Sequence, residues 1–259
     1  MTEQSNASDV HHKTRKVAWV TGVNQGIGAQ IMQQLMAQQI YVVGFDRCLQ
    51  HPVTTDLAEI YQCDVSDAEQ VTALCQKLLQ SAAPDYFIHA AGVLHLGEHD
   101  TLSEAMWLDT FAVNTFAPFY FLKHLSPHFR AKGSGSVVMV SSNSAHAPRI
   151  NMAAYGASKA ALTSFSQTVG LELAQFGVRV NIISPGSTAT PMLQQLWQDS
   201  KGEQQTIQGN LAKYKVGIPL QKIALTADIA NAVMFLISDQ ASHITMHDLV
   251  VDGGATLGR

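Results

Sequence analysis

Short apolar runs rich in β-branched residues alternate with longer segments of helical periodicity along most of this chain. Such alternation is typical of βαβ units, in which a helix crosses back over the sheet between two parallel strands. Several of the runs are apolar without interruption, as expected for strands covered by helices on both sides. We therefore predict an α/β fold: a Rossmann-type doubly wound parallel sheet of seven strands, helices on both faces, in a single domain. The strands are expected at 16–21, 40–45, 59–63, 85–90, 136–141, 178–184 and 248–252.

The expected helices are 26–38, 67–81, 103–130, 153–176 and 226–237. Two segments depart from the rhythm. Residues 47–58 are short for a crossover helix and contain Pro52, so we expect a loop or a single helical turn there. Residues 187–218 form a polar, Gln-rich insertion after a strand end, which predicts a substrate lid. Residues 1–15 are expected to be a flexible tail before one domain at 16–259.

The bulk properties narrow the class of protein. With 259 residues, 46% of them hydrophobic, the chain can form one large core. A net charge of −4 without a long basic run predicts no nucleic-acid partner. No apolar run is long enough for a bilayer and no secretory signal is present, so no membrane association is expected. Three cysteines without paired spacing predict reduced thiols, a cytoplasmic location and no metal site.

The turn after the first predicted strand is rich in glycine. In "VTGVNQGIG", Gly22, Gly26 and Gly28 end the strand and open the helix. Glycines allow a tight turn and close backbone approach, and the helix amino terminus then offers N–H groups to a pyrophosphate. A plain strand-to-helix turn needs only one glycine, so three predict a dinucleotide site.

A carboxylate ends the second predicted strand. Asp46 can accept hydrogen bonds from an adenosine ribose, and it repels a 2′-phosphate. Arg47 argues for the other cofactor because it could bind that phosphate, but Asn24 and Gln25 place no positive charge in the glycine turn. We therefore expect NAD rather than NADP. Asp64 either reaches the adenine edge or serves only as a helix cap.

Tyr155 and Lys159 lie four residues apart on a predicted helix, so they project from one face. Oxidation of an alcohol needs a base, but free tyrosine titrates near ~10, about three units too high at neutral pH. A lysine ammonium in a partly dehydrated site lowers that pKa. Ser142, at the end of the fifth strand, can orient the substrate oxygen. Although this pair alone is common on helix surfaces, its combination with the glycine turn predicts a dehydrogenase.

Together these motifs resemble the short-chain dehydrogenase/reductase family from "VTGVNQGIG" to "VVDGG". The resemblance implies that the tyrosine is the acid/base, that the lysine lowers its pKa and holds the ribose, and that Asn114 supports a water-linked proton path. It also implies a homotetramer built on the helices at 103–130 and 153–176. The implied catalytic residues are Tyr155, Lys159, Ser142 and Asn114. The implied NAD-binding residues are Gly22, Asn24, Gln25, Gly26, Ile27, Gly28, Asp46, Asp64, Val65, Ala91, Gly92, Tyr155, Lys159, Pro185, Gly186, Thr188 and Thr190.

One residue departs from the family pattern. Ala90 stands where the family has asparagine before Ala91 and Gly92, so the side-chain contacts of that asparagine are absent.

A narrower similarity rests on "HAPRINMAAYGASKAAL", "GIPLQKIA" and "VVDGGATLG". These stretches resemble the group of 2,3-dihydro-2,3-dihydroxybenzoate dehydrogenases of catechol siderophore biosynthesis. The group uses NAD to oxidise a carboxylated cyclohexadiene diol, and the ketone formed tautomerises to 2,3-dihydroxybenzoate. The implied partner is this small-molecule carboxylated dihydrodiol.

Within that resemblance, Ser142, Arg149 and Met192 are the expected substrate-binding residues. The planar guanidinium of Arg149 suits a carboxylate, although a surface arginine paired with solvent or a neighbouring subunit is the alternative. Met192 either packs on the ring or belongs to the core. Asn151 stands where the group has glycine, which affects a backbone contact to substrate.

Two other functions remain open from the sequence. One is reduction of a 3-oxoacyl thioester, which predicts NADPH and a basic docking surface. The other is a non-catalytic NAD-binding regulator, which has no need of Tyr155 or Lys159.

Overall fold

The computed structural model describes residues 15–49, 54–197 and 199–258. It contains one sheet with the strand order β3-β4-β2-β1-β5-β6-β7-β8. Only the first strand in this order, β3, is antiparallel to its neighbour, so seven parallel strands are present in the described chain and the predicted fold class is confirmed. The strands are β1 Val17–Thr21, β2 Tyr41–Asp46, β3 Thr54–Thr55, β4 Ala58–Gln62, β5 Tyr86–His89, β6 Gly135–Val140, β7 Val178–Pro185 and β8 Asp248–Val251.

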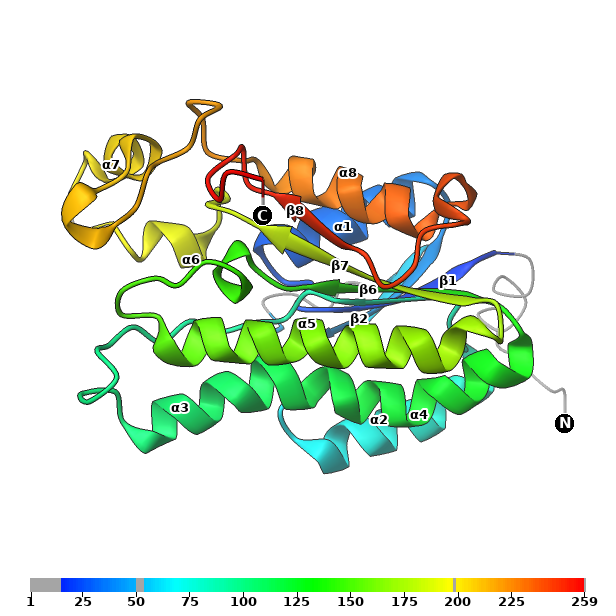
Figure 1. Cartoon of the computed structure of the whole chain (residues 1–259). Helices are drawn as coiled ribbons and strands as arrows, with labels where there is room; N and C mark the ends of the chain where they lie inside the picture. Colours follow the sequence, from blue (N-terminus) through cyan, green and yellow to red (C-terminus); the bar gives the residue numbers. More distant parts are fainter. Residues whose placement is uncertain (1–14, 50–53, 198, 259) are drawn as a thin grey trace, which may run out of the picture.

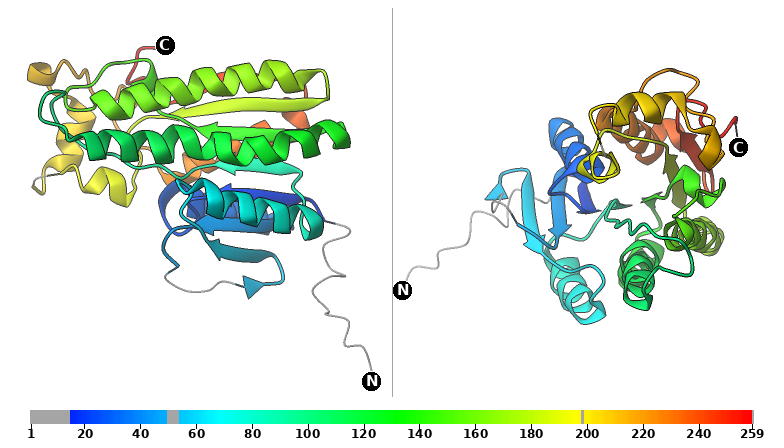
Figure 2. Two further views of the ribbon diagram at one scale, coloured as in Figure 1. Left: turned by 90° about the horizontal axis from the view of Figure 1, so that it is seen from below. Right: turned by 90° about the vertical axis from the view of Figure 1, so that its left-hand side faces the viewer.

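Helices cover both faces of the sheet (Figures 1 and 2). One face carries α1 and α8, which pack against each other, and the opposite face carries α2, α4 and α5. The main helices are α1 Gly26–Ala37, α2 Ala68–Ser81, α3 Glu104–Phe111, α4 Ala117–Lys132, α5 Ala153–Ala174 and α8 Thr226–Ile237. None of these or the shorter described helices combines the length and apolar composition that crossing a bilayer requires.

The sheet divides the interior into two hydrophobic cores. Successive residues of β1 alternate between them: Trp19 packs into the core under α2, α4 and α5, whereas Ala18 and Val20 pack into the core under α1 and α8. Because side chains alternate across a strand, an uninterrupted apolar run can fill both cores at once. This explains the unbroken apolar character of the central strands.

The helix predicted over 103–130 is wrong as a single α-helix. A π-helical segment, η2 Ala112–Phe116, separates α3 from α4. Pro118 lies in the first turn of α4 and has no N–H to donate to the carbonyl of Asn114, so the α-helical ladder is broken there. Asn114 lies within this interruption and is fully buried.

The segment between β2 and β4 forms part of a β-hairpin in the described residues, because β3 pairs antiparallel with β4. No helical turn is present in 47–49 or 54–58. Pro52 and most of the tail predicted over 1–15 lie outside the described residues.

The insertion at 187–218 contains two short helices, α6 Pro191–Gln194 and α7 Gly202–Gln208, and a 3-10 turn, η4 Leu211–Lys213. It packs on a small third core that includes Leu193 and Ile218. In Figure 1 the insertion projects beyond the carboxyl ends of β6 and β7. Its role as a substrate lid stays a prediction.

Candidate active site

The glycine turn between β1 and α1 packs so closely against neighbouring backbone that Gly22 and Gly28 have no room for a side chain. Gly22 has a φ of +73°, and a Cβ there would lie 2.8 Å from the backbone of Ala91. A Cβ on Gly28 would lie 2.0 Å from the carbonyl oxygen of Gly22. Only glycine permits this packing, and it leaves the amino terminus of α1 open toward a cavity. The turn therefore fits the pyrophosphate of a dinucleotide.

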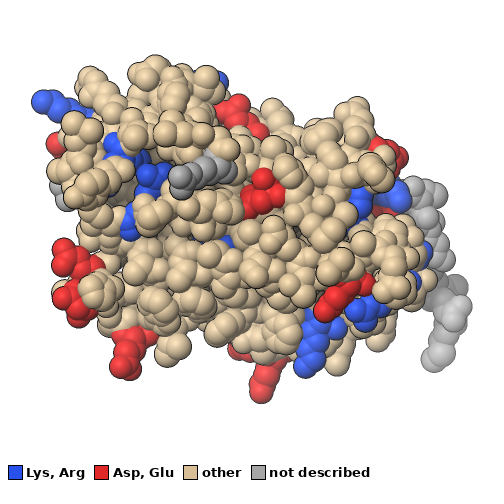
Figure 3. Space-filling view, viewed as in Figure 1, with Lys and Arg blue, Asp and Glu red and all other residues tan. Residues whose placement is uncertain are grey.

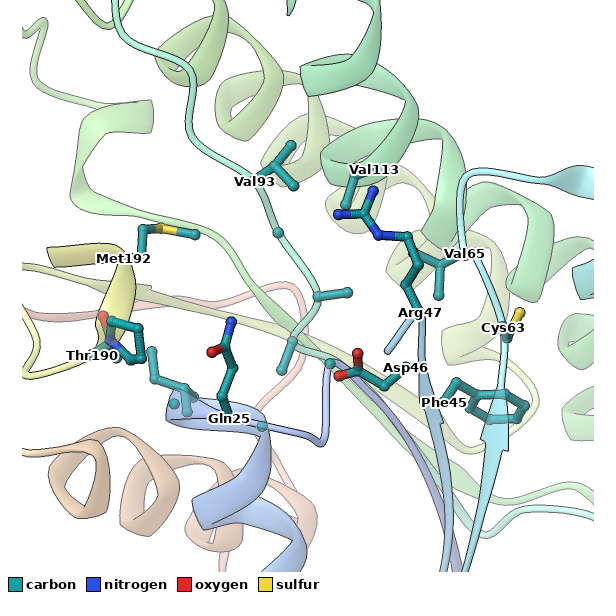
Figure 4. A pocket seen from close by; sticks show the side chains of 18 of the residues that line it. Gln25, Phe45, Asp46, Arg47, Cys63, Val65, Val93, Val113, Thr190 and Met192 are labelled. Atoms are coloured by element: carbon teal, nitrogen blue, oxygen red, sulfur yellow. The ribbon is translucent and has the colours of Figure 1, made fainter. Parts of the chain in front are cut away.

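Asp46 ends β2 at the edge of the same cavity. Its carboxylate accepts hydrogen bonds from the backbone N–H of Asn24, at 2.9 Å, and of Cys48, at 3.1 Å. Figure 4 shows the side chains of Gln25, Asp46 and Arg47 at this cavity. Both the predicted ribose-binding carboxylate and the competing arginine thus line this site.

Asp64 and Val65 follow β4 and also line this first cavity. The Asp64 carboxylate accepts hydrogen bonds from the N–H and, at 2.6 Å, from the hydroxyl of Ser66. The residue that caps α2 is Asp67, whose carboxylate accepts from two N–H groups of the first turn. Asp64 therefore shapes the turn that forms the cavity wall. The residue that caps α2 is Asp67 and not Asp64.

A second cavity adjoins the first and contains Ser142, Tyr155 and Lys159. Ser142 follows β6, and its hydroxyl accepts a hydrogen bond from the N–H of Ser144. Tyr155 and Lys159 come from the first two turns of α5. The Lys159 ammonium is buried and donates to the carbonyl of Val140 at 2.9 Å. Gly156 lets α5 approach this loop, because a Cβ there would already lie 3.2 Å from the Ser144 carbonyl.

The electrostatics of the pair follow from its burial. Burial raises the pKa of Tyr155, while the Ser142 hydroxyl lowers it. Burial lowers the pKa of Lys159 to about 8, so the ammonium remains charged at neutral pH. Its Nζ lies 5.9 Å from the centre of the Tyr155 ring. A positive charge at that distance favours the phenolate and so opposes the net rise in the Tyr155 pKa that burial causes.

Asn114 lies behind these residues and lines neither of the two cavities described. Its amide oxygen accepts from the N–H of Val93, and its amide nitrogen donates to the Val93 carbonyl and to the Ser158 hydroxyl. The Ser158 hydroxyl in turn donates to the carbonyl of Tyr155. Asn114 thus ties the loop after β5 to the helix that carries the tyrosine and lysine.

Ala90, which replaces an expected asparagine, is held through its backbone. The N–H groups of Ala90 and Ala91 both donate to the hydroxyl of Thr21 at 3.1 Å. The loop after β5 is therefore anchored to β1 without a polar side chain at this position.

Arg149 is half-buried and lines the second cavity. Burial lowers its pKa, and Asp252 raises it. None of the ion pairs in the described chain involves Arg149. Two residues further on, Asn151 has a φ of +63°, the left-handed conformation that glycine and asparagine adopt most easily. Asparagine can therefore keep the loop in a glycine-type backbone conformation.

Comparisons with known proteins agree with this geometry. A family model described as "Enoyl-(Acyl carrier protein) reductase" matches residues 22–256. The chain belongs to the short-chain dehydrogenase/reductase family. It is 47% identical to the 2,3-dihydro-2,3-dihydroxybenzoate dehydrogenase of Escherichia coli (strain K12), over 94% of this chain and 98% of that protein. It is 42% identical to the enzyme of the same name from Bacillus subtilis (strain 168), over 94% and 97%.

A solved structure also matches closely. It is a 4-hydroxyisoleucine dehydrogenase mutant complexed with NADH and succinate, with a TM-score of 0.86 and 28% identity, over 94% of this chain and all (100%) of that one. The family resemblance inferred from the sequence motifs is confirmed.

The structure brings most of the residues predicted from the family together in the two adjoining cavities. Asn114 and Asn24 are the exceptions. Asn24 lines neither cavity, and its backbone N–H donates a hydrogen bond to the Asp46 carboxylate. The first cavity is lined by Gly22, Gln25, Gly26, Ile27, Gly28, Asp46, Asp64, Val65, Ala91, Gly92, Thr190 and Met192. The second is lined by Ile27, Gly92, Ser142, Arg149, Tyr155, Lys159, Pro185, Gly186, Thr188, Thr190 and Met192.

Sequence reasoning missed several residues of the second cavity. Leu94, Met152 and Leu196 add apolar walls, and Lys215 adds a second cation. Leu94 and Met152 lie close to motif residues, so their proximity to the motifs could have suggested them. No local pattern distinguishes Lys215 from the other lysines of the insertion.

Proposed function

We propose that this chain oxidises 2,3-dihydro-2,3-dihydroxybenzoate to 2,3-dihydroxybenzoate with NAD, as a step of catechol siderophore biosynthesis. The observation that carries the proposal is the shared cavity of Arg149 with Ser142, Tyr155 and Lys159. A cation that forms no ion pair in the described chain, next to a dehydrogenase acid/base pair, fits an alcohol that bears a carboxylate. The names of the relatives from Escherichia coli and Bacillus subtilis describe the same reaction.

The residues divide the chemistry among them. Ser142 holds the reacting hydroxyl, and the phenolate oxygen of Tyr155 removes its proton. Lys159 stabilises that phenolate and binds the ribose, while Asn114 keeps the start of α5 in place and supports the path by which the proton leaves. NAD, held by the residues that line the two cavities, would supply the hydride acceptor for the carbon that carries this hydroxyl. The resulting ketone gains aromaticity when it tautomerises, which favours the oxidative direction.

The cofactor site favours NAD over NADP. Asp46 presents a carboxylate where a 2′-phosphate would meet its negative charge, and described residues of the glycine turn add no cation to offset it. The three glycines cradle the pyrophosphate, and Asp64 and Val65 border the adenine. Pro185, Gly186, Thr188 and Thr190 border the nicotinamide end.

Substrate contacts come from two sides. Arg149 binds the carboxylate, and Met192, which lines both cavities, packs on the substrate ring. The insertion at 187–218 acts as the lid of this site.

The assembly proposed for the chain is a homotetramer in the cytoplasm. The outer surfaces of α3, η2, α4 and α5 expose large apolar side chains, which are Met106, Trp107, Leu108, Phe116, Phe119 and Leu171. Figure 3 shows few charged side chains where α5 crosses the visible face. A monomer rarely exposes so many apolar side chains on neighbouring helices, so this surface is suited to contact between subunits.

The direct test is incubation of the purified protein with the dihydrodiol and NAD. The proposal predicts that NADH and 2,3-dihydroxybenzoate form in equal amounts. A folded protein that binds NAD but forms neither product would contradict the proposed function.

A further inference from the structure

Lys215 places a second positive charge in the cavity that contains Tyr155 and Arg149. It belongs to the insertion, whereas Arg149 belongs to the loop between β6 and α5. Neither side chain lines the first cavity, where the dinucleotide phosphates are expected. The anion that suits these two cations is therefore part of the substrate.

The local backbone holds Lys215 in this position. Lys215 and Asn210 exchange two backbone hydrogen bonds, of 2.7 and 2.9 Å. Tyr214, with a φ of +52°, turns the chain between them. Gly209 allows the close return, because a Cβ there would lie 2.3 Å from the Lys215 carbonyl oxygen. As a result, Tyr214 and Val216 are exposed by 87% and 59%, while Lys215 between them is partly buried.

Neither cation forms an ion pair with a carboxylate of the described chain, although the charge of Asp252 favours the charged form of Arg149. Burial lowers the pKa of Lys215, and repulsion from Arg149 and Lys213 lowers it further. None of the ion pairs between described residues includes either Lys215 or Arg149. The nearby carboxylate of Asp252 is already engaged by Asn143 and Thr256. An anion between the two cations would relieve their repulsion and offset their desolvation.

We propose that Lys215 binds the substrate carboxylate together with Arg149, so that one carboxylate joins the insertion to the loop that leads to Tyr155. This assignment rests on the proposed function and adds a second specificity residue to it. A carboxylated substrate would therefore favour closure of the proposed lid, because Lys215 of the insertion contacts the ligand. Figure 3 shows Lys and Arg side chains gathered at the end of the molecule where the insertion lies.

The test measures binding of 2,3-dihydroxybenzoate and of catechol, which lacks the carboxylate, to the NAD-loaded protein by calorimetry. Lys215→Met should weaken binding of 2,3-dihydroxybenzoate about 10-fold, the loss expected for one charge-assisted hydrogen bond. Catechol binding should change by less than about 2-fold, well below that single-bond loss. The matched control is Lys213→Met, because Lys213 is exposed on the same turn and lines neither cavity described.

A second variant and a second readout guard against an effect on folding. Lys215→Arg keeps the charge and should retain most of the preference for the carboxylated ligand. In the wild type, 2,3-dihydroxybenzoate should slow hydrogen exchange of residues 202–217 more than catechol does, and Lys215→Met should remove that difference. Equal losses for both ligands, or no loss for either, would overturn the assignment.

The outcomes separate this inference from the proposed function. If the wild type oxidises the dihydrodiol and Lys215→Met binds both ligands as the wild type does, only the role of Lys215 is wrong. If the wild type neither oxidises the dihydrodiol nor prefers 2,3-dihydroxybenzoate to catechol, both are wrong. A wild type that shows the preference and loses it in Lys215→Met, but lacks turnover, supports the carboxylate site and contradicts the reaction.

Discussion

Tyr155→Phe removes only the hydroxyl that accepts the substrate proton in the proposed reaction. Because general base catalysis contributes about 100-fold or more, we expect kcat to fall by at least that factor. The phenylalanine ring fits the same half-buried position, so the dissociation constant for NAD should stay close to that of the wild type. Steady-state kinetics and a cofactor titration measure the two effects. Substantial turnover in this variant would assign the base to another group.

Arg149→Ala tests the carboxylate contact. Because the substrate carboxylate is present in both the ground state and the transition state, its loss should appear mainly in KM. We expect KM for the carboxylated dihydrodiol to rise about 10-fold or more, the loss for one ionic hydrogen-bonded contact. KM for a dihydrodiol without the carboxylate serves as the internal control and should change much less. Equal increases for the two substrates would remove Arg149 from carboxylate recognition.

At the scale of elements, the central strand β5 ends on a buried histidine beneath the site. His89 is fully buried, and its Nδ1 lies 3.0 Å from the Thr21 hydroxyl. That hydroxyl accepts two backbone N–H groups, so its own proton points to Nδ1 and the imidazole is neutral. Burial and, to a smaller extent, the charge of Lys159 lower the pKa of His89 to about 3.

This depressed pKa makes the fold sensitive to acid. Between about 6.5 and 3 the unfolded chain binds a proton at His89 that the folded protein excludes, so stability falls as the pH falls through that range. From pH 7 to pH 5 the contribution is about 2 kcal/mol of unfolding free energy. Urea unfolding of the wild type and of His89→Gln at both pH values measures it. An identical pH dependence of the two proteins would show that His89 does not set this sensitivity.

The elements differ in how far the sequence could predict them. The seven parallel strands were predictable because their apolar runs must fill a core on each side of the sheet. The positions of Tyr155 and Lys159 were predictable because a four-residue spacing on a helix places both on one face. These features depend on local periodicity, which the sequence displays directly.

Apart from Pro118, which marks the break at η2 in the sequence, the other features depend on contacts between distant residues. The break at η2 accompanies Asn114 contacts with the loop after β5 and with α5. Lys213 and Lys215 are equivalent in "LAKYKVG", and only the turn at Tyr214 decides which one enters the cavity. The hairpin of β3 with β4 depends on strand pairing, and no sequence pattern in the short segment 47–58 predicts that pairing.

At the scale of the whole molecule, the apolar surface of α4 and α5 predicts assembly. Phe119 on α4 lies edge-on to Phe165 on α5, which joins the two helices into one surface. A charge at exposed Leu171 or Phe119 would have to be buried in a subunit contact, so Leu171→Glu and Phe119→Glu should reduce the tetramer to smaller species. Sedimentation velocity measures the mass. Leu211→Glu, at a site 90% exposed on the insertion, is the control and should leave the tetramer intact. A monomeric wild type would contradict the assembly.

The most direct test of the central claim compares the two candidate reactions on one preparation of the protein. The kcat/KM for the dihydrodiol with NAD is measured beside that for a 3-oxoacyl thioester with NADPH, and each substrate is also tried with the other cofactor. The proposed function predicts efficient formation of 2,3-dihydroxybenzoate with NAD, much less with NADP, and little thioester reduction. Preferred reduction of the thioester with NADPH would contradict it.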